Sequence, residues 1–261
     1  MKRVFTMLLA AVLIIACVLT VGCKKEEAKT FTVGFDAEFP PHGFVDENGD
    51  YVGFDLDLAA EVASRRGWEL KLQPIEWAAK DMEIESGTID CIWNGFTMNN
   101  RLDQYTWTDA YMDNSQIIVV KGDSGIATFA DLAGKVVTAQ ADSAALNEIN
   151  SDEYADLKAS FKELVVCSQY NAAFMELEAG AVDAIAMDIT AARYNIGQRG
   201  GNFVILDEII TEEQYGVGFK LGNTELRDQV QETLLEMVED GTFKTISEKW
   251  FDGMDVCILG K

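Results

Sequence analysis

The sequence predicts an α/β fold built from two similar lobes. Short apolar runs typical of strands alternate with longer runs that have helical periodicity, which favours sheets flanked by helices. One helix–turn–strand segment occurs twice, at residues 84–92 and 177–185. Nearly half of the 261 residues are apolar and 10% are aromatic, which is too hydrophobic for a disordered chain.

The elements follow from periodicity and from turn residues. Strands are expected at residues 31–35, 68–73, 117–120, 136–139 and 165–167. Helices are expected at residues 55–66, 144–149, 171–178, 190–196 and 225–240. The first helix places Leu56, Ala59 and Val62 on one face and ends at Gly67. This alternation of strands and helices implies a largely parallel sheet.

The repeated segment indicates where a ligand would bind. In each copy a helix stops at a glycine, which takes the left-handed conformation without steric cost, and an apolar strand begins around an aspartate. If the two lobes are alike, the strand ends at 93–95 and 186–188 are equivalent. Ligands of open α/β sheets bind outside the carboxyl ends of strands, so we expect a cleft lined by both tripeptides.

The N-terminus has the pattern of an export signal. Residues 1–22 contain Lys2, Arg3 and no acid, and the rest of that stretch carries no charge. Residues 19–23 resemble the bacterial lipobox, although Thr20 stands where leucine is preferred. We therefore expect a leader at 1–22, lipidation of Cys23 and a flexible tether at 23–29. Lipidation of Cys17 and an uncleaved membrane helix are the alternatives, since about 20 apolar residues span a bilayer.

Charge and cysteine content exclude several functions. The 44 acidic and 21 basic residues give a net charge of -23, which argues against nucleic acid and anionic lipid as partners. Cys91, Cys167 and Cys257 have no metal-ligand spacing; one disulfide is possible, but the sequence does not indicate its pairing. No phosphate-binding, zinc or calcium motif is present, so we expect neither cofactor nor metal.

A set of motifs covers nearly all of the chain from Phe31 to Phe251. They lie at 33–44 (VGFDAEFPPHGF), 53–58 (GFDLDL), 86–90 (SGTID), 95–98 (GFTM) with Arg101, 135–137 (KVV), 183–188 (DAIAMD), 214–216 (QYG), 241–243 (GTF) and 249–251 (KWF). Together they resemble the polar-amino-acid solute-binding proteins of ABC importers, bacterial extracellular solute-binding proteins of family 3. The resemblance implies a two-lobed periplasmic-binding-protein (Venus-flytrap) fold, each lobe a sheet flanked by helices, joined by two hinge strands near 114–116 and 213–215. Lobe 1 would then be residues 30–115 with 214–261, and lobe 2 residues 116–213.

The resemblance also implies a function and part of a site. Such proteins close on one free amino acid, here polar or basic, and deliver it to a membrane permease. Arg101 matches the arginine that binds the ligand carboxylate, for which a guanidinium offers two parallel donors. The loop between Thr97 and Arg101 is one residue shorter than in many relatives. Thr97 and the backbone of Asn94 and Gly95 would complete the contacts to the carboxylate and amino groups.

The second lobe would supply the partner of the ammonium group. Asp188 matches the family's aspartate, and its other possible role, a helix N-cap before Thr190, is compatible with ligand binding. The loop from Gln140 to Ala144 runs into a helix whose first N–H groups favour a carboxylate. Ser143 caps that helix or contacts the ligand, and the sequence leaves this open.

The ligand side chain would lie among Asp36, Phe39 and Trp77. Aromatic faces hold aliphatic, amide or cationic groups, although ordinary core packing is the alternative for both aromatics. Asp36 would accept hydrogen bonds from an amide or pair with a cation. Trp93 and Trp107 are expected to pack in the core.

An enzyme is the runner-up to a binding protein. His42 is the single histidine, so no Ser-His-Asp arrangement with a choice of base exists, and it is expected to pack or to touch a ligand edge. Cyclohexadienyl dehydratases resemble these binders, and such an enzyme would need a proton donor, for example a buried glutamate, in the cleft. A ligand-sensing ectodomain is the third alternative. We expect a non-enzymatic, exported monomer, lipid-anchored to the cell membrane.

Overall fold

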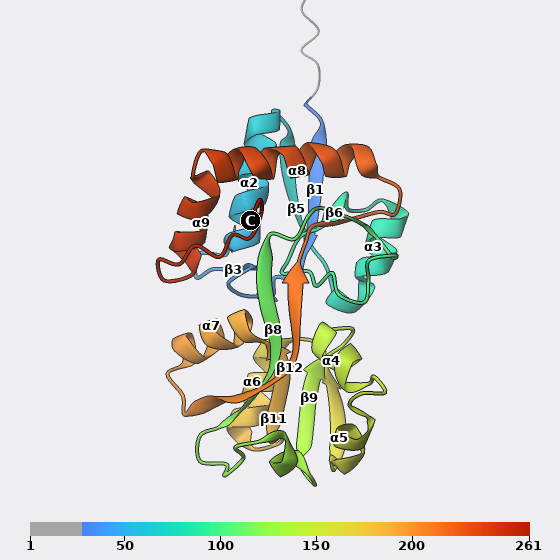
Figure 1. Cartoon of the computed structure of the whole chain (residues 1–261). Helices are drawn as coiled ribbons and strands as arrows, with labels where there is room; N and C mark the ends of the chain where they lie inside the picture. The colour runs from blue at the N-terminus through green and yellow to red at the C-terminus, as the bar shows by residue number, and fades with distance from the viewer. Residues whose placement is uncertain (1–27) are drawn as a thin grey trace, which may run out of the picture.

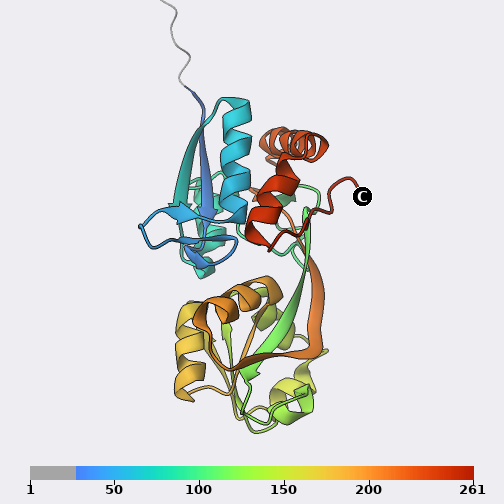
Figure 2. The same ribbon diagram turned by 90° about the vertical axis from the view of Figure 1, so that its left-hand side faces the viewer.

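Two lobes are stacked end to end and joined by two long strands (Figure 1, Figure 2). The computed structural model describes residues 28–261, so the expected leader, Cys17 and Cys23 lie outside the described residues. The connecting strands are β8 (Met112–Lys121) and β12 (Phe203–Tyr215). Between residues 28 and 261, every helix is too short or too polar to cross a membrane.

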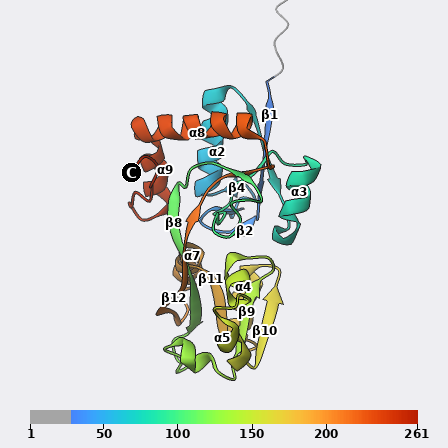
Figure 3. The same ribbon diagram turned by 45° about the vertical axis from the view of Figure 1, so that its right-hand side comes forward.

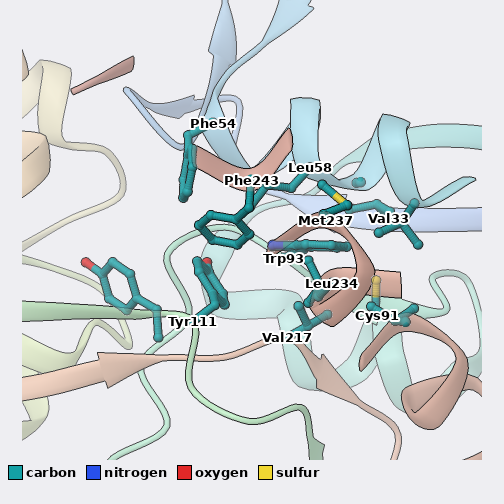
Figure 4. Close-up of a cluster of buried hydrophobic side chains, with 14 of the residues drawn as sticks. Val33, Phe54, Leu58, Cys91, Trp93, Tyr111, Val217, Leu234, Met237 and Phe243 are labelled. Carbon is teal, nitrogen blue, oxygen red and sulfur yellow. The ribbon is translucent and has the colours of Figure 1, made fainter. Parts of the chain in front are cut away.

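Lobe 1 is a five-stranded sheet with helices on both faces. Its strands in spatial order are β5 (Glu69–Pro74), β1 (Thr30–Phe35), β6 (Cys91–Ile92), β13 (Gly218–Phe219) and β7 (Thr106–Trp107). One face packs against α2 (Phe54–Arg66), α8 (Thr224–Glu239) and α9 (Thr242–Trp250), in a core that includes Val33, Phe54, Trp93 and Met237 (Figure 4). The other face packs against α3 (Lys80–Ser86), which follows the 3-10 turn η1 (Trp77–Ala79).

A small second sheet of lobe 1 faces lobe 2 (Figure 3). It consists of β2 (Glu38–Phe39), β3 (Gly43–Val45) and β4 (Tyr51–Val52). Gly53 joins it to α2 with a φ of 147°, and a Cβ there would lie 2.2 Å from the carbonyl oxygen of His42. The close approach of these two backbone segments therefore requires glycine at position 53.

Lobe 2 repeats the layered arrangement. Its sheet has the order β10 (Glu163–Cys167), β9 (Val136–Gln140), β11 (Ala184–Asp188), β8 and β12. On one face lie α6 (Tyr170–Ala179) and α7 (Ile189–Arg199), and on the other α4 (Ala144–Ile149) with the short α5 (Ala155–Ser160) and the 3-10 turn η2 (Phe129–Leu132). Ile117 and Val119 of β8 pack toward α6 and α7, and Ile118 and Val120 toward α4. Burial on both faces explains why this run is apolar at every position.

The two sheets share one topology, as the repeated segment suggested. Gly87 and Gly180 end α3 and α6 in the left-handed conformation. Asp90 accepts a hydrogen bond from the N–H of Thr32 at 2.7 Å, and Asp183 accepts one from Val136 at 2.8 Å. In each repeat the aspartate thus fixes the new strand to its parallel neighbour.

One strand of each sheet runs opposite to the other four, so the expectation of a largely parallel sheet is confirmed with that exception. β5, β1 and β6 run parallel, as do β10, β9 and β11. β13 is antiparallel to β6 and β7, and β8 is antiparallel to β11 and β12, so β7 and β12 run in the same direction as the parallel strands of their sheets. The cause is the double crossing between lobes, which adds β8 and β12 to one sheet and β7 and β13 to the other. In the hinge, β8 and β12 pair antiparallel, with Asn114 opposite Glu213 and Met112 opposite Tyr215.

The remaining expected strands and helices all occur, with ends shifted by a few residues, and β8 is much longer than the apolar run at 117–120. The short strands β2, β3, β4, β7 and β13 and the helices α5 and α9 were not expected, whereas α3 is the helix that the repeat predicts to end at Gly87. Cys91, Cys167 and Cys257 are buried free thiols, so the disulfide left open by the sequence is not formed among them.

Candidate functional site

A small cavity lies between the lobes, at the carboxyl ends of β6 and β11. The space there that atoms do not fill, including the part open to solvent, is about 310 Å³. Its lining consists of the eleven residues singled out from the sequence: Asp36, Phe39, Trp77, Asn94, Gly95, Thr97, Arg101, Gln140, Ser143, Ala144 and Asp188. Seven come from lobe 1, and four come from lobe 2, at the end of β9, the start of α4 and the end of β11.

Arg101 reaches the cavity despite its shortened loop. Its guanidinium donates to the carbonyl oxygen of Thr97 at 3.2 Å and, across the cleft, to that of Asp142 at 3.3 Å. The indole N–H of Trp107 donates to the Arg101 carbonyl at 3.0 Å, and Asn100 takes a positive φ of 62° to complete the tight turn. Arg101 is 7% exposed. The guanidinium is therefore held in place by two of its five N–H donors, and others are left for a ligand.

Asn94 and Gly95 line the cavity, but the N–H of Gly95 does not face a ligand. It donates at 2.5 Å to the buried carboxylate of Asp55, whose other oxygen accepts from the Tyr111 hydroxyl. That N–H is therefore not free for a ligand, because the buried Asp55 carboxylate takes it, and the expected ligand contacts through the backbone of Asn94 and Gly95 stay a prediction. The side-chain oxygen of Asn94 accepts from the N–H of Asp36 at 2.7 Å, and its amide nitrogen is buried with no partner among residues 28–261.

The loop after β9 supplies the lobe 2 wall. Gln140 donates across the cleft to Asp36 Oδ2 at 2.7 Å and also to the carbonyl oxygen of Ser168. Ser143 caps α4, since its hydroxyl accepts from the N–H of Leu146 at 3.1 Å, and it also borders the cavity. The two roles that the sequence left open are thus compatible.

Asp36 lines both the cavity that contains Arg101 and Asp188 and a second, wider cavity, here called the outer cavity. Asp36 is 5% exposed, and its carboxylate accepts from the N–H of Glu38 at 2.9 Å. Burial raises the pKa of Asp36, and the nearby Glu76 carboxylate adds to the rise. The pKa of Glu38 is raised as well, first by burial and then by Asp36 and Glu76. Asp36, Glu38 and Glu76 all line the outer cavity, so three acids gather there.

Asp188 lies at the end of β11, 5% exposed. Although it precedes α7, its side chain makes no capping bond. Its Oδ1 instead accepts from Tyr215 at 2.5 Å, from Gln116 at 2.7 Å and from Asn114 at 3.0 Å. The Asp188 side chain therefore does not cap α7, because its carboxylate accepts hydrogen bonds from residues of the hinge strands β8 and β12. Burial raises the pKa of Asp188 in spite of these donors.

The aromatic residues connect the lobes. The ring of Phe39 stacks on His42 with centroids 5.5 Å apart and packs against Tyr170 of lobe 2 at 6.1 Å. His42 is fully buried; its Nε2 lies 3.0 Å from the Thr190 hydroxyl and its Nδ1 3.4 Å from Asp55. His42 thus packs beneath the cavity and does not line it, and Trp93 and Trp107 are buried as expected.

Two functional candidates were missed by the sequence reasoning. Lys80, 1% exposed, forms an ion pair across the cleft with Asp142, and its ammonium lies 5.2 Å from the ring centroid of Trp77. Glu213, 3% exposed, lies beside Asp188 in the hinge. The alternation in β12 contains a signal for Glu213, since it places this residue on the same face as Tyr215. No local signal marks Lys80, because its partner comes from lobe 2.

The contacts across the cleft describe a closed arrangement. Besides Lys80–Asp142 and Asp36–Gln140, Asn100 donates to Glu148 at 3.3 Å. Residues on the two lobes thereby enclose a space bounded by an arginine, an aspartate and aromatic rings.

Comparisons with known proteins agree with this geometry. Residues 31–253 match the family model of bacterial extracellular solute-binding proteins, family 3. The L-cystine-binding protein TcyJ of Escherichia coli K12 is 29% identical over 236 residues, covering 89% of this chain and 86% of the relative. The ABC transporter arginine-binding protein 1 of the same organism is 26% identical, covering 86% and 91%.

Solved structures lead to the same family. A substrate-binding protein of an ABC uptake transporter from Streptococcus pneumoniae, with bound histidine, superposes with a TM-score of 0.84 at 34% identity, covering 88% of this chain and 94% of the other. An ancestral arginine-binding protein bound to arginine gives a TM-score of 0.79 at 36% identity, covering 85% and 98%. The chain belongs to the bacterial extracellular solute-binding proteins, family 3.

Proposed function

We propose that this protein captures a free amino acid in the interlobe cavity and delivers it to the permease of an ABC transporter. The observation that carries the proposal is the enclosed cavity with Arg101 on one lobe and Asp188 on the other. An arginine suits the α-carboxylate and an aspartate the α-ammonium group, so a zwitterion satisfies both lobes at once. Because the ligand contacts both lobes only when they are shut, its binding selects the closed form.

Within that class, we propose an amino acid whose side chain ends in a cation. Asp36, Glu38 and Glu76 gather at the outer side of the cavity, and their mutual repulsion contributes to the raised pKa values of Asp36 and Glu38. A cationic group placed among them would relieve this repulsion. Arginine, lysine, ornithine and, through its second ammonium group, cystine carry such a charge.

A thermal-shift screen tests both levels of the proposal. The panel is the twenty amino acids with ornithine and cystine, and a ligand at 100 times its dissociation constant adds about 2.7 kcal/mol to the unfolding free energy. We expect the largest shift from arginine, lysine, ornithine or cystine. A largest shift from glutamate or aspartate would overturn the cationic class, and the absence of any shift would overturn amino-acid capture.

The variant Asp36→Asn separates side-chain recognition from capture of the α-groups. A charge-assisted bond contributes about 1.5 to 3 kcal/mol, so calorimetry should show cationic ligands bound about tenfold or more weakly, with glutamine much less affected. Asp50→Asn, an exposed change in the β3–β4 turn, is the matched control. Equal losses for arginine and glutamine would contradict the assigned role of Asp36.

We further propose that lipid at Cys23 tethers the protein to the membrane. The support is the lipobox-like sequence at 19–23, followed by a polar segment and the first strand at Thr30. Cys23→Ala should move the protein from the membrane fraction to the soluble fraction. If Cys17→Ala releases it and Cys23→Ala does not, the lipidated residue is Cys17.

A dehydratase is a second candidate because Glu213 is a buried glutamate near the cleft. It does not line the cavity that contains Arg101 and Asp188, however, and its Oε1 accepts bonds from two hinge amides. The relatives named above are binding proteins. Formation of an aromatic product from a cyclohexadienyl acid, followed by ultraviolet absorbance, would favour the enzyme and count against capture.

A further inference from the structure

Beside Asp188 the hinge contains a second buried carboxyl group. We propose that Glu213 holds a proton while the cleft is empty and releases it to solvent when a ligand ammonium group binds at Asp188. The inference rests on the proposed function, since it requires an amino-acid ligand.

The two carboxyl groups are held together by shared donors. Asn114 Nδ2 donates to Asp188 Oδ1 at 3.0 Å and to Glu213 Oε1 at 2.6 Å. Gln116 Nε2 donates to the same two oxygens at 2.7 and 2.8 Å. Two amide groups thus bridge two acids that come from β11 and β12. The distance between Asp188 Oδ1 and Glu213 Oε1 therefore cannot exceed the summed lengths of two such hydrogen bonds.

In the described part of the chain, these two carboxyl groups have no ion-pair partner. Within residues 28–261, neither Asp188 nor Glu213 lies at ion-pair distance from a lysine, arginine or histidine, and Glu213 Oε2 is buried without a partner. Two ionised carboxylates at this spacing, removed from water, repel strongly. The titratable groups around the pair are Tyr215 on β12, Tyr170 on α6, His42 after β2, and Arg101, Lys80, Asp81, Asp142 and Glu148 around the neighbouring cavity that Glu213 lines.

The hydrogen bonds indicate which acid is protonated. Asp188 Oδ1 accepts from three donors, including the Tyr215 hydroxyl, and donors of this kind stabilise the ionised form. Among the described residues, Glu213 accepts from two donors on Oε1 and from none on Oε2. Burial and the adjacent Asp188 raise the pKa of Glu213 to about 8, so at neutral pH the proton belongs mainly to Glu213.

When the ligand binds, its ammonium group would then replace the proton of Glu213 as the positive charge beside Asp188. Before binding, the pair carries one negative charge, with Asp188 ionised and Glu213 neutral. The ammonium group adds one positive charge, Glu213 gives its proton to water, and the buried group keeps the same net charge. The proton has a way out, because Glu213 lines a neighbouring cavity that shares Thr97, Arg101 and Ala144 with the ligand cavity.

Calorimetry in buffers of different ionisation enthalpy tests the exchange. The probe is the amino acid that gives the largest thermal shift in the panel, titrated into the whole protein at neutral pH. We expect release of about one proton per ligand, and affinity that rises about tenfold per pH unit until the pH reaches the pKa of Glu213. Glu213→Gln should abolish both effects, whereas Glu212→Gln, an exposed neighbour on the same strand, should leave them intact.

Infrared spectroscopy gives a readout that needs no variant. The ligand-free protein should show the carbonyl stretch of a protonated carboxylic acid, and this band should disappear when the ligand is added. Binding without proton release, with the band unchanged, would overturn the exchange and leave amino-acid capture standing. Failure of every amino acid to bind would overturn both. If Glu213→Gln and Glu212→Gln changed proton release and the pH dependence of affinity equally, the cause would be a general charge effect, and the exchange would also be overturned.

Discussion

The role of Arg101 can be tested by truncating it. Arg101 is 7% exposed, and its guanidinium donates to the carbonyl oxygens of Thr97 and Asp142. A ligand carboxylate would take further donors in a pocket largely shielded from water. Arg101→Ala removes the whole fork and leaves the carboxylate without its partner.

The expected loss follows from hydrogen bonds to a charged group. One such bond contributes about 1.5 to 3 kcal/mol, and the two bonds of a fork do not add fully, so the loss should be about 2 to 4 kcal/mol. This corresponds to a dissociation constant about 30 to 1000 times higher. Arg101→Lys keeps the charge but not the planar fork, and we expect about a tenfold loss.

Isothermal titration with the best amino acid of the panel measures these constants. Arg193→Ala is the control, because Arg193 is exposed and does not line the ligand cavity. Thermal melting of each ligand-free variant checks that it is folded. If Arg101→Ala melts like the parent protein and binds with unchanged affinity, the carboxylate does not lie at Arg101 and the proposed orientation is refuted.

Two further variants test closure and backbone geometry. Asp142→Asn should lower ligand affinity about tenfold, because closure would bury the Lys80 ammonium with only the more distant Asp81 carboxylate, at 4.0 Å, as its partner. Small-angle scattering with ligand should show a larger open fraction, and an unchanged affinity would show that the Lys80–Asp142 pair does not stabilise closure. Gly53→Ala should lower the unfolding free energy by about 3 kcal/mol or more, because the new Cβ would clash with the backbone of the preceding loop. Gly49 also has a positive φ but lies in open space, so Gly49→Ala should lower it by about 1 kcal/mol. Urea unfolding measures both values, and equal losses would contradict the steric explanation.

Much of the fold could be predicted because its signals are local. The apolar face of α2 and the glycines at positions 87 and 180 act within a few residues, and the structure shows them as expected. The short strands β7 and β13 could not be predicted, since two residues carry no periodicity and they exist only as partners of β6 and of each other. For the same reason the sheets are mixed, because strand direction depends on where the chain returns.

The candidate site, like the fold, could be predicted only in part from the sequence. The motifs selected eleven residues that line one cavity, but they did not show that the N–H of Gly95 is taken by Asp55 or that Asp188 is bonded to the hinge strands. These are bonds between segments far apart in the chain. They determine which donors and acceptors remain for a ligand.

The sequence by itself determined the chemistry available at the cleft: an arginine for a carboxylate, an aspartate for an ammonium group, and an acid beside aromatic rings for a side chain. The tertiary structure decided how those groups are charged and held. Closure of lobe 2 over lobe 1 removes water from Lys80, Asp36 and Asp188, and the pairing of β8 with β12 brings Glu213 against Asp188. Side-chain identity is a local property, whereas desolvation and the proximity of charges depend on what packs from elsewhere in the fold.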